Sequence, residues 1–326
     1  MNAAQNFLEG WPAVQAVLDA ASVALPLAAF LSYCGLGLIS ALAKILSHAR
    51  KRASFDKCAR QLALLGFILG WIMLVGVRVW LFLTPTGGGK AVLLVWLAEI
   101  CWLLLAVSVL LASLYYALWK HTAKYPALGI SLGLSGGLAA CAALFCALAT
   151  ARFTVLGLTA SATDAKAGEI FAALSKIFVN AADSLPLWNM LWYTPALIVA
   201  LAGGLGALWL FARRNHDDFG RDHYNAMIAW CTSLSRNAWL LLWCFLLIFC
   251  VRQLAASLNP QLAGTVEFWQ EIATEAAYLL YWAIPALLWT FVGRSQTPLR
   301  CSIAVLAAFA LACTFLVPYY LEICAV

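Results

Sequence analysis

Two acidic residues stand out because each lies inside a long apolar stretch. Glu99 opens an apolar run that continues to Lys120, and Glu275 opens another that continues to Arg294. A charged side chain at membrane depth is costly, so such residues commonly mark proton relays or substrate sites. Both carboxylates are therefore candidates for accepting a proton or holding a ligand.

Arg78 is the predicted partner of Glu99, because only a short loop joins the two apolar segments that carry them. Two interpretations of this pair stay open. In the first, Glu99 accepts a proton from a quinol or the pair binds an anionic group, and Arg78 keeps the carboxylate charged. In the second, the pair is a structural ion pair that fixes helix register. Glu275 holds the matching place in the second half and is assigned the same catalytic role.

Four further residues are candidates for binding a cofactor. Arg236 lies near the middle of a span, where its guanidinium suits an anionic group such as a propionate or carboxylate, or a buried carboxylate partner. Arg152 and Arg252 end two spans on the side of Glu99, and Trp102 could stack on a flat ring. Many of the other tryptophans fit an interfacial aromatic belt.

The chain carries few metal-ligand patterns. All four histidines lie at the ends of spans, so a bis-histidine haem b in the bilayer core is not expected. A haem held by His48 and His121 at the cytoplasmic edge is the alternative. The eleven cysteines form no CxxC or zinc-type spacing, and they are interpreted as small buried residues. No P-loop or hydrolase motif is present.

Composition predicts the elements that position these residues. The chain of 326 residues is 65% hydrophobic and only 10% charged, which is typical of an all-α polytopic membrane protein. A span needs about 20 apolar residues. Eight segments qualify, namely 18–46, 61–83, 91–119, 127–157, 186–212, 225–251, 270–292 and 300–321.

The distribution of basic residues predicts the orientation. Most of the 20 lysines and arginines follow the first, third, fifth and seventh spans, so these loops are expected in the cytoplasm and both termini outside it. A bacterial inner membrane is the expected location. The net charge of +6 lies at helix ends and indicates no nucleic-acid partner. The charged loop 213–224 is interpreted as a solvated loop or as a docking surface for other subunits of a complex.

The two halves share a pattern that predicts a duplication. Basic residues and a nearby Asp–Phe or Phe–Asp pair precede each acidic span, and a proline follows it. The pattern divides the chain into a four-helix unit at 1–157, a non-cytoplasmic linker at 158–185 and a second four-helix unit at 186–326. The units have the same orientation, as in a parallel repeat. The linker contains either an amphipathic helix on the membrane surface or a simple connecting helix.

The stretch from Phe55 to Arg152 resembles the first half of cytochrome bd quinol oxidase subunit I. The resemblance rests on Phe55-Asp56, Ala59-Arg60 and Ala98-Glu99, after a basic loop. It implies a four-helix unit that handles a quinol, but the family's haem-ligating histidine of the first helix has no counterpart between positions 21 and 46. The chain also resembles the haem-free membrane subunits of the polysulfide-reductase type, without their Asp-Leu-Gly-Pro signature.

These observations predict an integral subunit of a respiratory electron-transfer complex that handles a quinone near the non-cytoplasmic face. It would be the membrane part of a quinone-linked oxidoreductase, with quinone as the expected cofactor and the lipid bilayer and neighbouring subunits as partners. A secondary transporter is the first alternative. A structural or assembly subunit without a site of its own is the second.

Overall fold

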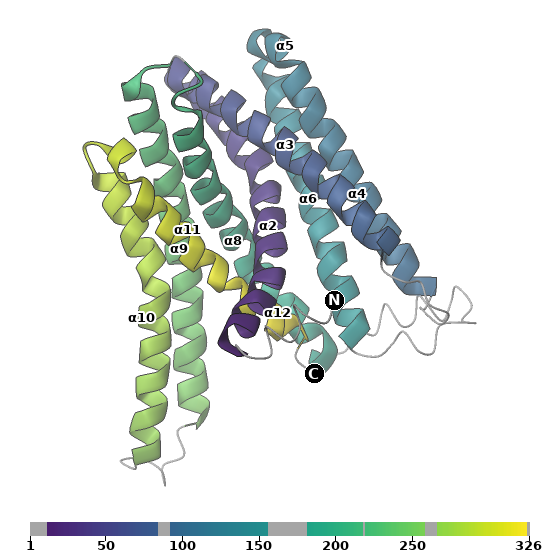
Figure 1. Ribbon diagram of the computed structural model, residues 1–326, viewed down its shortest axis with the longest axis vertical. Helices are drawn as coiled ribbons and strands as arrows, with labels where there is room; N and C mark the ends of the chain where they lie inside the picture. Colours follow the sequence, from purple (N-terminus) through teal and green to yellow (C-terminus); the bar gives the residue numbers. More distant parts are fainter. Residues whose placement is uncertain (1–11, 84–91, 156–180, 218, 258–265, 325–326) are drawn as a thin grey trace.

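The computed structural model describes residues 12–83, 92–155, 181–217, 219–257 and 266–324, and the secondary structure in these ranges is helical (Figure 1). The helices are α2 (Pro12–Arg50), α3 (Ala53–Leu83), α4 (Val92–Ala117), α5 (Trp119–Lys124), α6 (Pro126–Val155), α8 (Ala181–Arg213), α9 (Arg221–Ser257), α10 (Val266–Arg294), α11 (Ser302–Thr314) and α12 (Leu316–Cys324), with a short 3₁₀ turn, η1 (Pro298–Arg300). Eight helical segments in the described ranges are long and apolar enough to cross a membrane. The predicted all-α polytopic fold is therefore confirmed.

The helices pack in two rings of four. In the first half, α2 packs on α3, α3 on α4, α4 on α6, and α6 returns to α2. In the second half, α8 packs on α9, α9 on α10, α10 on α11, and α11 returns to α8. The first helices of the two rings, α2 and α8, lie against each other at the centre of the molecule (Figure 1). The duplication itself, with the boundaries given above, stays a prediction.

Small residues bring helices close together where a ring closes. A Cβ atom at Gly37 of α2 would lie 2.8 Å from the carbonyl oxygen of Gly133 in α6, and one at Gly137 would lie 2.8 Å from Leu38. Gly129, Gly133 and Gly137 recur every four residues along α6. Such a stripe allows two membrane helices to approach closely enough for their backbones to touch.

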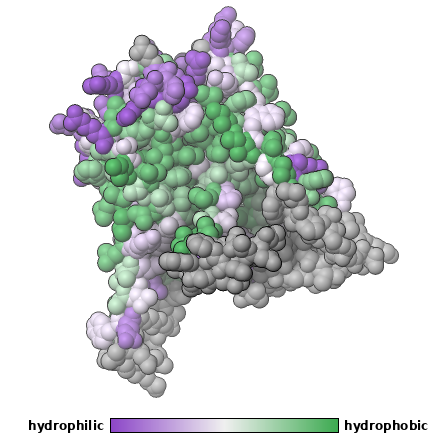
Figure 2. Space-filling view, in the orientation of Figure 1, coloured by the Kyte–Doolittle hydropathy of each residue, from purple (hydrophilic) through white to green (hydrophobic). Residues whose placement is uncertain are grey.

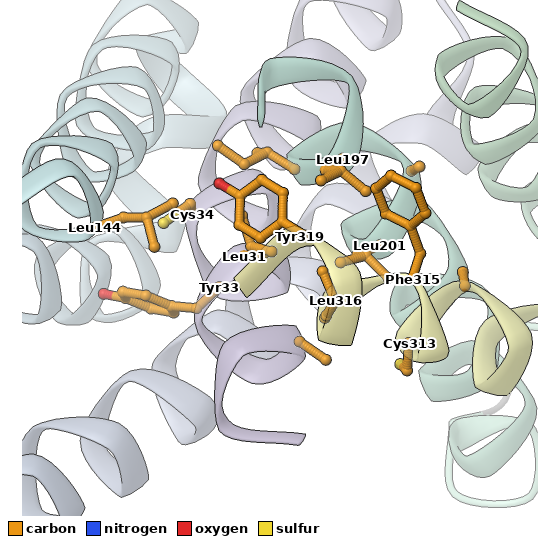
Figure 3. Close-up of a cluster of buried hydrophobic side chains, with 14 of the residues drawn as sticks. Leu31, Tyr33, Cys34, Leu144, Leu197, Leu201, Cys313, Phe315, Leu316 and Tyr319 are labelled. Carbon is orange, nitrogen blue, oxygen red and sulfur yellow. The ribbon is translucent and has the colours of Figure 1, made fainter. Parts of the chain in front are cut away.

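The contact between the two rings is equally tight. A Cβ atom at Gly35 of α2 would lie 2.5 Å from the Cβ atom of Ala202 and 2.5 Å from the carbonyl oxygen of Ile198, both in α8. Around this crossing, Leu31 and Cys34 of α2 share a buried apolar cluster with residues of α6, α8, α11 and α12 (Figure 3). Tyr319 of α12 lies in the same cluster, so α12 helps to hold the two rings together.

The last span consists of two consecutive helices. The expected segment, 300–321, is confirmed as one membrane span, Ser302–Leu321, within which α11 ends at Thr314 and α12 begins at Leu316. Pro318 explains the break, because proline lacks an N–H and its ring collides with the carbonyl four residues earlier, which is that of Thr314. Beyond the break, α12 packs against α2 and α6 of the other ring.

Other predicted boundaries moved by a few residues. Helix α8 begins at Ala181, inside the segment assigned to the linker, and its described membrane span begins at Trp192. Helix α4 ends at Ala117, and α5 follows as a separate short helix. The amphipathic helix expected in the linker falls mostly on 156–180, outside the described residues.

The surface has a polar end and an apolar belt (Figure 2). Hydrophilic side chains gather at the end formed by α5 and by the α2–α3, α8–α9 and α10–α11 connections, which we call the basic face. Below it, large apolar side chains such as Ile72, Leu287 and Ile303 are exposed around the bundle. This belt is the surface expected against lipid tails.

Candidate functional site

The second ring contains a cavity of about 630 Å³ on the side away from the basic face. Its walls come from the start of α8, the last turns of α9, the start of α10, and α12. This space lies where α12 packs against α2 and α6 of the first ring and leaves the outer parts of α9 and α10 without a fourth helix. Figure 1 shows α9 and α10 extending away from α12.

Aromatic side chains form most of the cavity wall. They are Trp192, Tyr193, Phe245, Phe249, Tyr278, Phe315 and Tyr319. Tyr193 and Tyr319 meet edge to face, with ring centroids 5.7 Å apart. The Tyr319 hydroxyl lies 2.9 Å from the hydroxyl of Thr194, so its polar end is fixed. Aromatic walls of this kind suit a flat, apolar ring system.

Glu275 is the only carboxylate among the described lining residues, and no lysine, arginine or histidine accompanies it. It lies on α10, is half-buried, and has no ion-pair partner among the described residues. The buried residue Cys250, on α9, lines the same cavity. The described wall of the cavity thus has one carboxylate among mostly aromatic side chains.

A tryptophan cluster supports the inner end of this cavity. Trp239 of α9 is fully buried and donates a hydrogen bond to the carbonyl of Trp282 in α10, over 2.7 Å. Its ring contacts Trp289 and Phe315 edge to face, with centroids 5.7 Å apart in both cases. Because Phe315 also lines the cavity, the cluster holds that wall in place.

The predicted contact between Arg78 and Glu99 is confirmed. One guanidinium nitrogen of Arg78 lies 2.7 and 2.9 Å from the two carboxylate oxygens of Glu99. Trp102 lies beneath the guanidinium, 4.9 Å away, and its indole donates to the carbonyl of Leu74 over 3.3 Å. The pair is not buried, however. The side chains are 51% and 42% exposed, at the outer ends of their spans.

The two acidic residues therefore occupy different surroundings. Glu99 is paired with Arg78 on the outside of the first ring, whereas Glu275 faces a cavity with no cationic side chain among its described lining residues. The lateral position of a helical residue depends on how the helix is rotated against its neighbours. Spacing along the chain does not determine that rotation.

We expect Glu99→Gln to have a small effect. An exposed ion pair contributes about 0–1 kcal/mol, so the melting temperature of the purified protein should fall by only a few degrees. Adding Arg78→Gln should change it little further. A large loss of stability in the single variant, restored in the double variant, would show instead that the pair holds the fold together.

The other arginines with a predicted ligand role lie outside the cavity. Arg152 is buried near the end of α6, and Arg252 is exposed near the end of α9. Arg236 is half-buried in mid-span, and its guanidinium donates to the side-chain oxygen of the adjacent Asn237 over 3.0 and 2.8 Å. Asn237 thus satisfies these two guanidinium nitrogens of Arg236 without a propionate-type ligand or a carboxylate partner.

His48 and His121 are both exposed at the basic face. His48 borders a cavity of about 280 Å³ that also includes Lys44 and Asp56. Among the described residues, no group of three or more His, Cys, Asp or Glu side chains is arranged to hold a metal ion. Lys44, which falls within the predicted span 18–46, is buried in α2, bonded to Asp56 and 4.4 Å from the ring of Trp119.

Several residues of the cavity were not predicted. From the sequence, Cys250 and Tyr319 are ordinary apolar or interfacial residues, and Phe315 is part of a continuous span. One partial signal was present: Pro318 lies within the final apolar segment, and a proline there kinks or breaks a helix, although Pro26 and Pro285 lie inside unbroken helices. The position of that break next to Glu275 could be found only from the packed helices.

Comparison with known protein families, curated proteins and solved structures gave no match to this chain.

Proposed function

We propose that this protein is an integral subunit of a respiratory electron-transfer complex and binds a quinone or quinol in the Glu275 cavity. The observation that supports this proposal is the cavity itself. It is about 630 Å³ in volume, mostly aromatic, and has a single carboxylate without a cationic partner among its described lining residues. A volume of this order accommodates the head of a ring-containing ligand.

The chemistry of a quinol fits these walls. Its ring would pack on the aromatic side chains, and a hydroxyl would donate to Glu275. On oxidation a quinol releases two protons and two electrons. Glu275 would take one proton, the second would pass to water at the membrane surface, and both electrons would go to a redox centre on a neighbouring subunit. The apolar tail would leave the cavity beside Trp192, which is 72% exposed at its edge.

The distribution of basic residues supports placing the basic face in the cytoplasm, in a bacterial inner membrane. Glu275 lies in the first turns of the span Phe268–Arg294, at the end away from the basic face. The proposed site is then close to the non-cytoplasmic surface, where protons are released. Haem b has no part in this proposal, since no histidine lines the cavity and His48 and His121 are exposed at the opposite end.

The proposal is tested with a variant in which a larger side chain fills the cavity. Leu246 lines it from α9, so Leu246→Trp should displace a bound ring and raise the Kd for a soluble quinone analogue at least about tenfold, equivalent to about 1.4 kcal/mol. Leu241→Trp on the exposed face of the same helix is the matched control and should bind like the wild type. Binding is measured by quenching of tryptophan fluorescence and by ligand-induced thermal stabilisation.

Equal binding by both variants would place the quinone elsewhere. No binding by the wild-type protein would contradict the proposal.

A second candidate function is secondary transport. It is favoured by one observation, the broken span beside the cavity, because broken helices commonly form transporter sites. Uptake of an amphiphilic acid into proteoliposomes, driven by a proton gradient and lost in Leu246→Trp, would support that candidate.

A further inference from the structure

A second cavity, of about 510 Å³, lies at the basic face of the second ring. Three arginines line it: Arg214 follows α8, Arg221 begins α9, and Arg300 ends η1. We call it the arginine cavity. None of these three side chains has an ion-pair partner among the described residues. Three positive charges from three separate elements thus converge on one space.

The acidic residue in the wall, Asp217, is already bound. The guanidinium of Arg213 donates to its two oxygens over 3.0 and 2.5 Å, and the amide of Gln61 donates over 2.9 Å. Burial alone would raise the pKa of Asp217, but these hydrogen bonds outweigh it and hold the pKa below its usual value. Asp217 is therefore a fixed anion paired with Arg213, and it leaves the three arginines of the cavity available.

The backbone adds donors to the same space. Gly220 and Arg221 lie in the wall at the start of α9, a helix of 37 residues whose first N–H groups have no acceptor within the helix. Gly220 has a φ of +80°, which lets the chain turn sharply into α9. Asn225 accepts a hydrogen bond from the backbone N–H of Leu299 over 3.1 Å, and this contact holds η1 and Arg300 against α9.

The arginine cavity lies where the apolar spans of the second ring end, which is the depth expected for lipid headgroups. The spans on its border end at Arg213, begin at Arg221 and begin at Ser302, and the lining residues lie in and beside the connections between them. An anion held here would be at the boundary between the apolar belt and water. Phosphate oxygens match a set of guanidinium forks and helix N–H groups at this depth.

The corresponding place in the first ring has a different charge pattern. Its cavity of about 280 Å³ also lies between the end of the first helix, the start of the second and the start of the fourth. There Lys44 is bonded to Asp56, and no arginine lines the space. The second ring alone presents unpaired arginines among the described residues at this position.

From this arrangement we propose that the arginine cavity binds a phosphate group, carried by an anionic phospholipid or by a free phosphate compound. Arg214, Arg221 and Arg300 bind its oxygens, and the start of α9 contributes backbone N–H donors. This site is independent of the Glu275 cavity, which lies toward the opposite end of the molecule.

The test uses the purified full-length protein in a neutral detergent with three probes: phosphatidylglycerol, phosphatidylcholine and inorganic phosphate. Thermal stabilisation and native mass spectrometry report binding. A lipid site predicts a retained phosphatidylglycerol and a raised melting temperature with that lipid only. A site for free phosphate compounds predicts stabilisation by inorganic phosphate as well. The shift should shrink as salt increases, because the arginines are exposed.

The double variant Arg214→Gln/Arg300→Gln should bind the anionic probe at least about a hundredfold more weakly than the wild type does. Each charge-assisted hydrogen bond that is lost corresponds to about tenfold in affinity. The matched control is Arg52→Gln with Lys120→Gln, which removes the same charge from the same face outside the cavity and should bind like the wild type. Replacing Arg214 and Arg300 by lysine should restore part of the affinity.

Failure of both anionic probes to stabilise or remain with the wild-type protein would overturn the proposal, as would equal binding by the two double variants. Stabilisation by phosphatidylcholine as strong as by phosphatidylglycerol would also overturn it, because the effect would then come from the lipid tails. These outcomes are separate from quinone binding, which Arg300→Gln should leave unchanged.

Discussion

Glu275→Gln is expected to slow quinol oxidation about 10²–10⁴-fold, the usual contribution of a positioned proton acceptor. Glutamine has nearly the same shape as glutamate but cannot take the proton that a quinol must lose. Quinone affinity should change much less than the rate, because the aromatic wall that holds the ring is intact. The rate is measured with a reduced quinone analogue in the assembled complex, and affinity by fluorescence quenching.

The matched control is Glu99→Gln, the same change at the other acidic residue. Because Glu99 is paired with Arg78 on the outside of the bundle, we expect this variant to retain near wild-type turnover. If Glu99→Gln loses activity and Glu275→Gln does not, the site of proton transfer is in the first ring. If both variants keep full activity, neither carboxylate accepts the proton, and proton transfer to a carboxylate is ruled out.

Gly35→Leu is expected to separate or unfold the two rings. Any side chain at this position must enter the space of Ala202 and the backbone carbonyl of Ile198, each 2.5 Å from the Cβ position. Backbone cannot move aside as a flexible side chain can, so the helices α2 and α8 must separate and lose the cluster around Leu31 (Figure 3). Overpacking of this kind typically costs about 1–3 kcal/mol, and the upper end is expected where backbone is the obstacle.

The measurement is thermal unfolding of the purified protein, together with its yield as a monodisperse species. Gly76→Leu is the control, since it makes the same change within α3 and no atom lies within 4 Å of the new Cβ atom. A melting temperature for Gly35→Leu equal to that of Gly76→Leu would show that α2 and α8 do not meet at this glycine. Leu31→Ala would then be needed to locate the contact between the rings.

The sequence by itself determined the membrane class, the eight spans and the ends at which charge collects. These are local properties, because a segment of about 20 apolar residues satisfies its backbone as a helix in lipid wherever its neighbours lie. The contact of Arg78 with Glu99 was also predictable, since two antiparallel helices joined by a short loop place their adjoining ends together. Pairing in such cases depends on proximity along the chain.

Only the tertiary structure decided which acidic residue has a cavity. Glu275 acquires its surroundings from α8, α9 and α12, which lie elsewhere in the sequence, and the space lies where α12 packs against the first ring. Likewise, Arg214, Arg221 and Arg300 converge because η1 is bonded to α9 through Asn225. Helix rotation and tilt follow from close packing at sites such as Gly35 and Gly37, where sub-ångström differences in shape select one arrangement. That selection involves many side chains at once, so hydropathy and spacing along the chain do not reveal it.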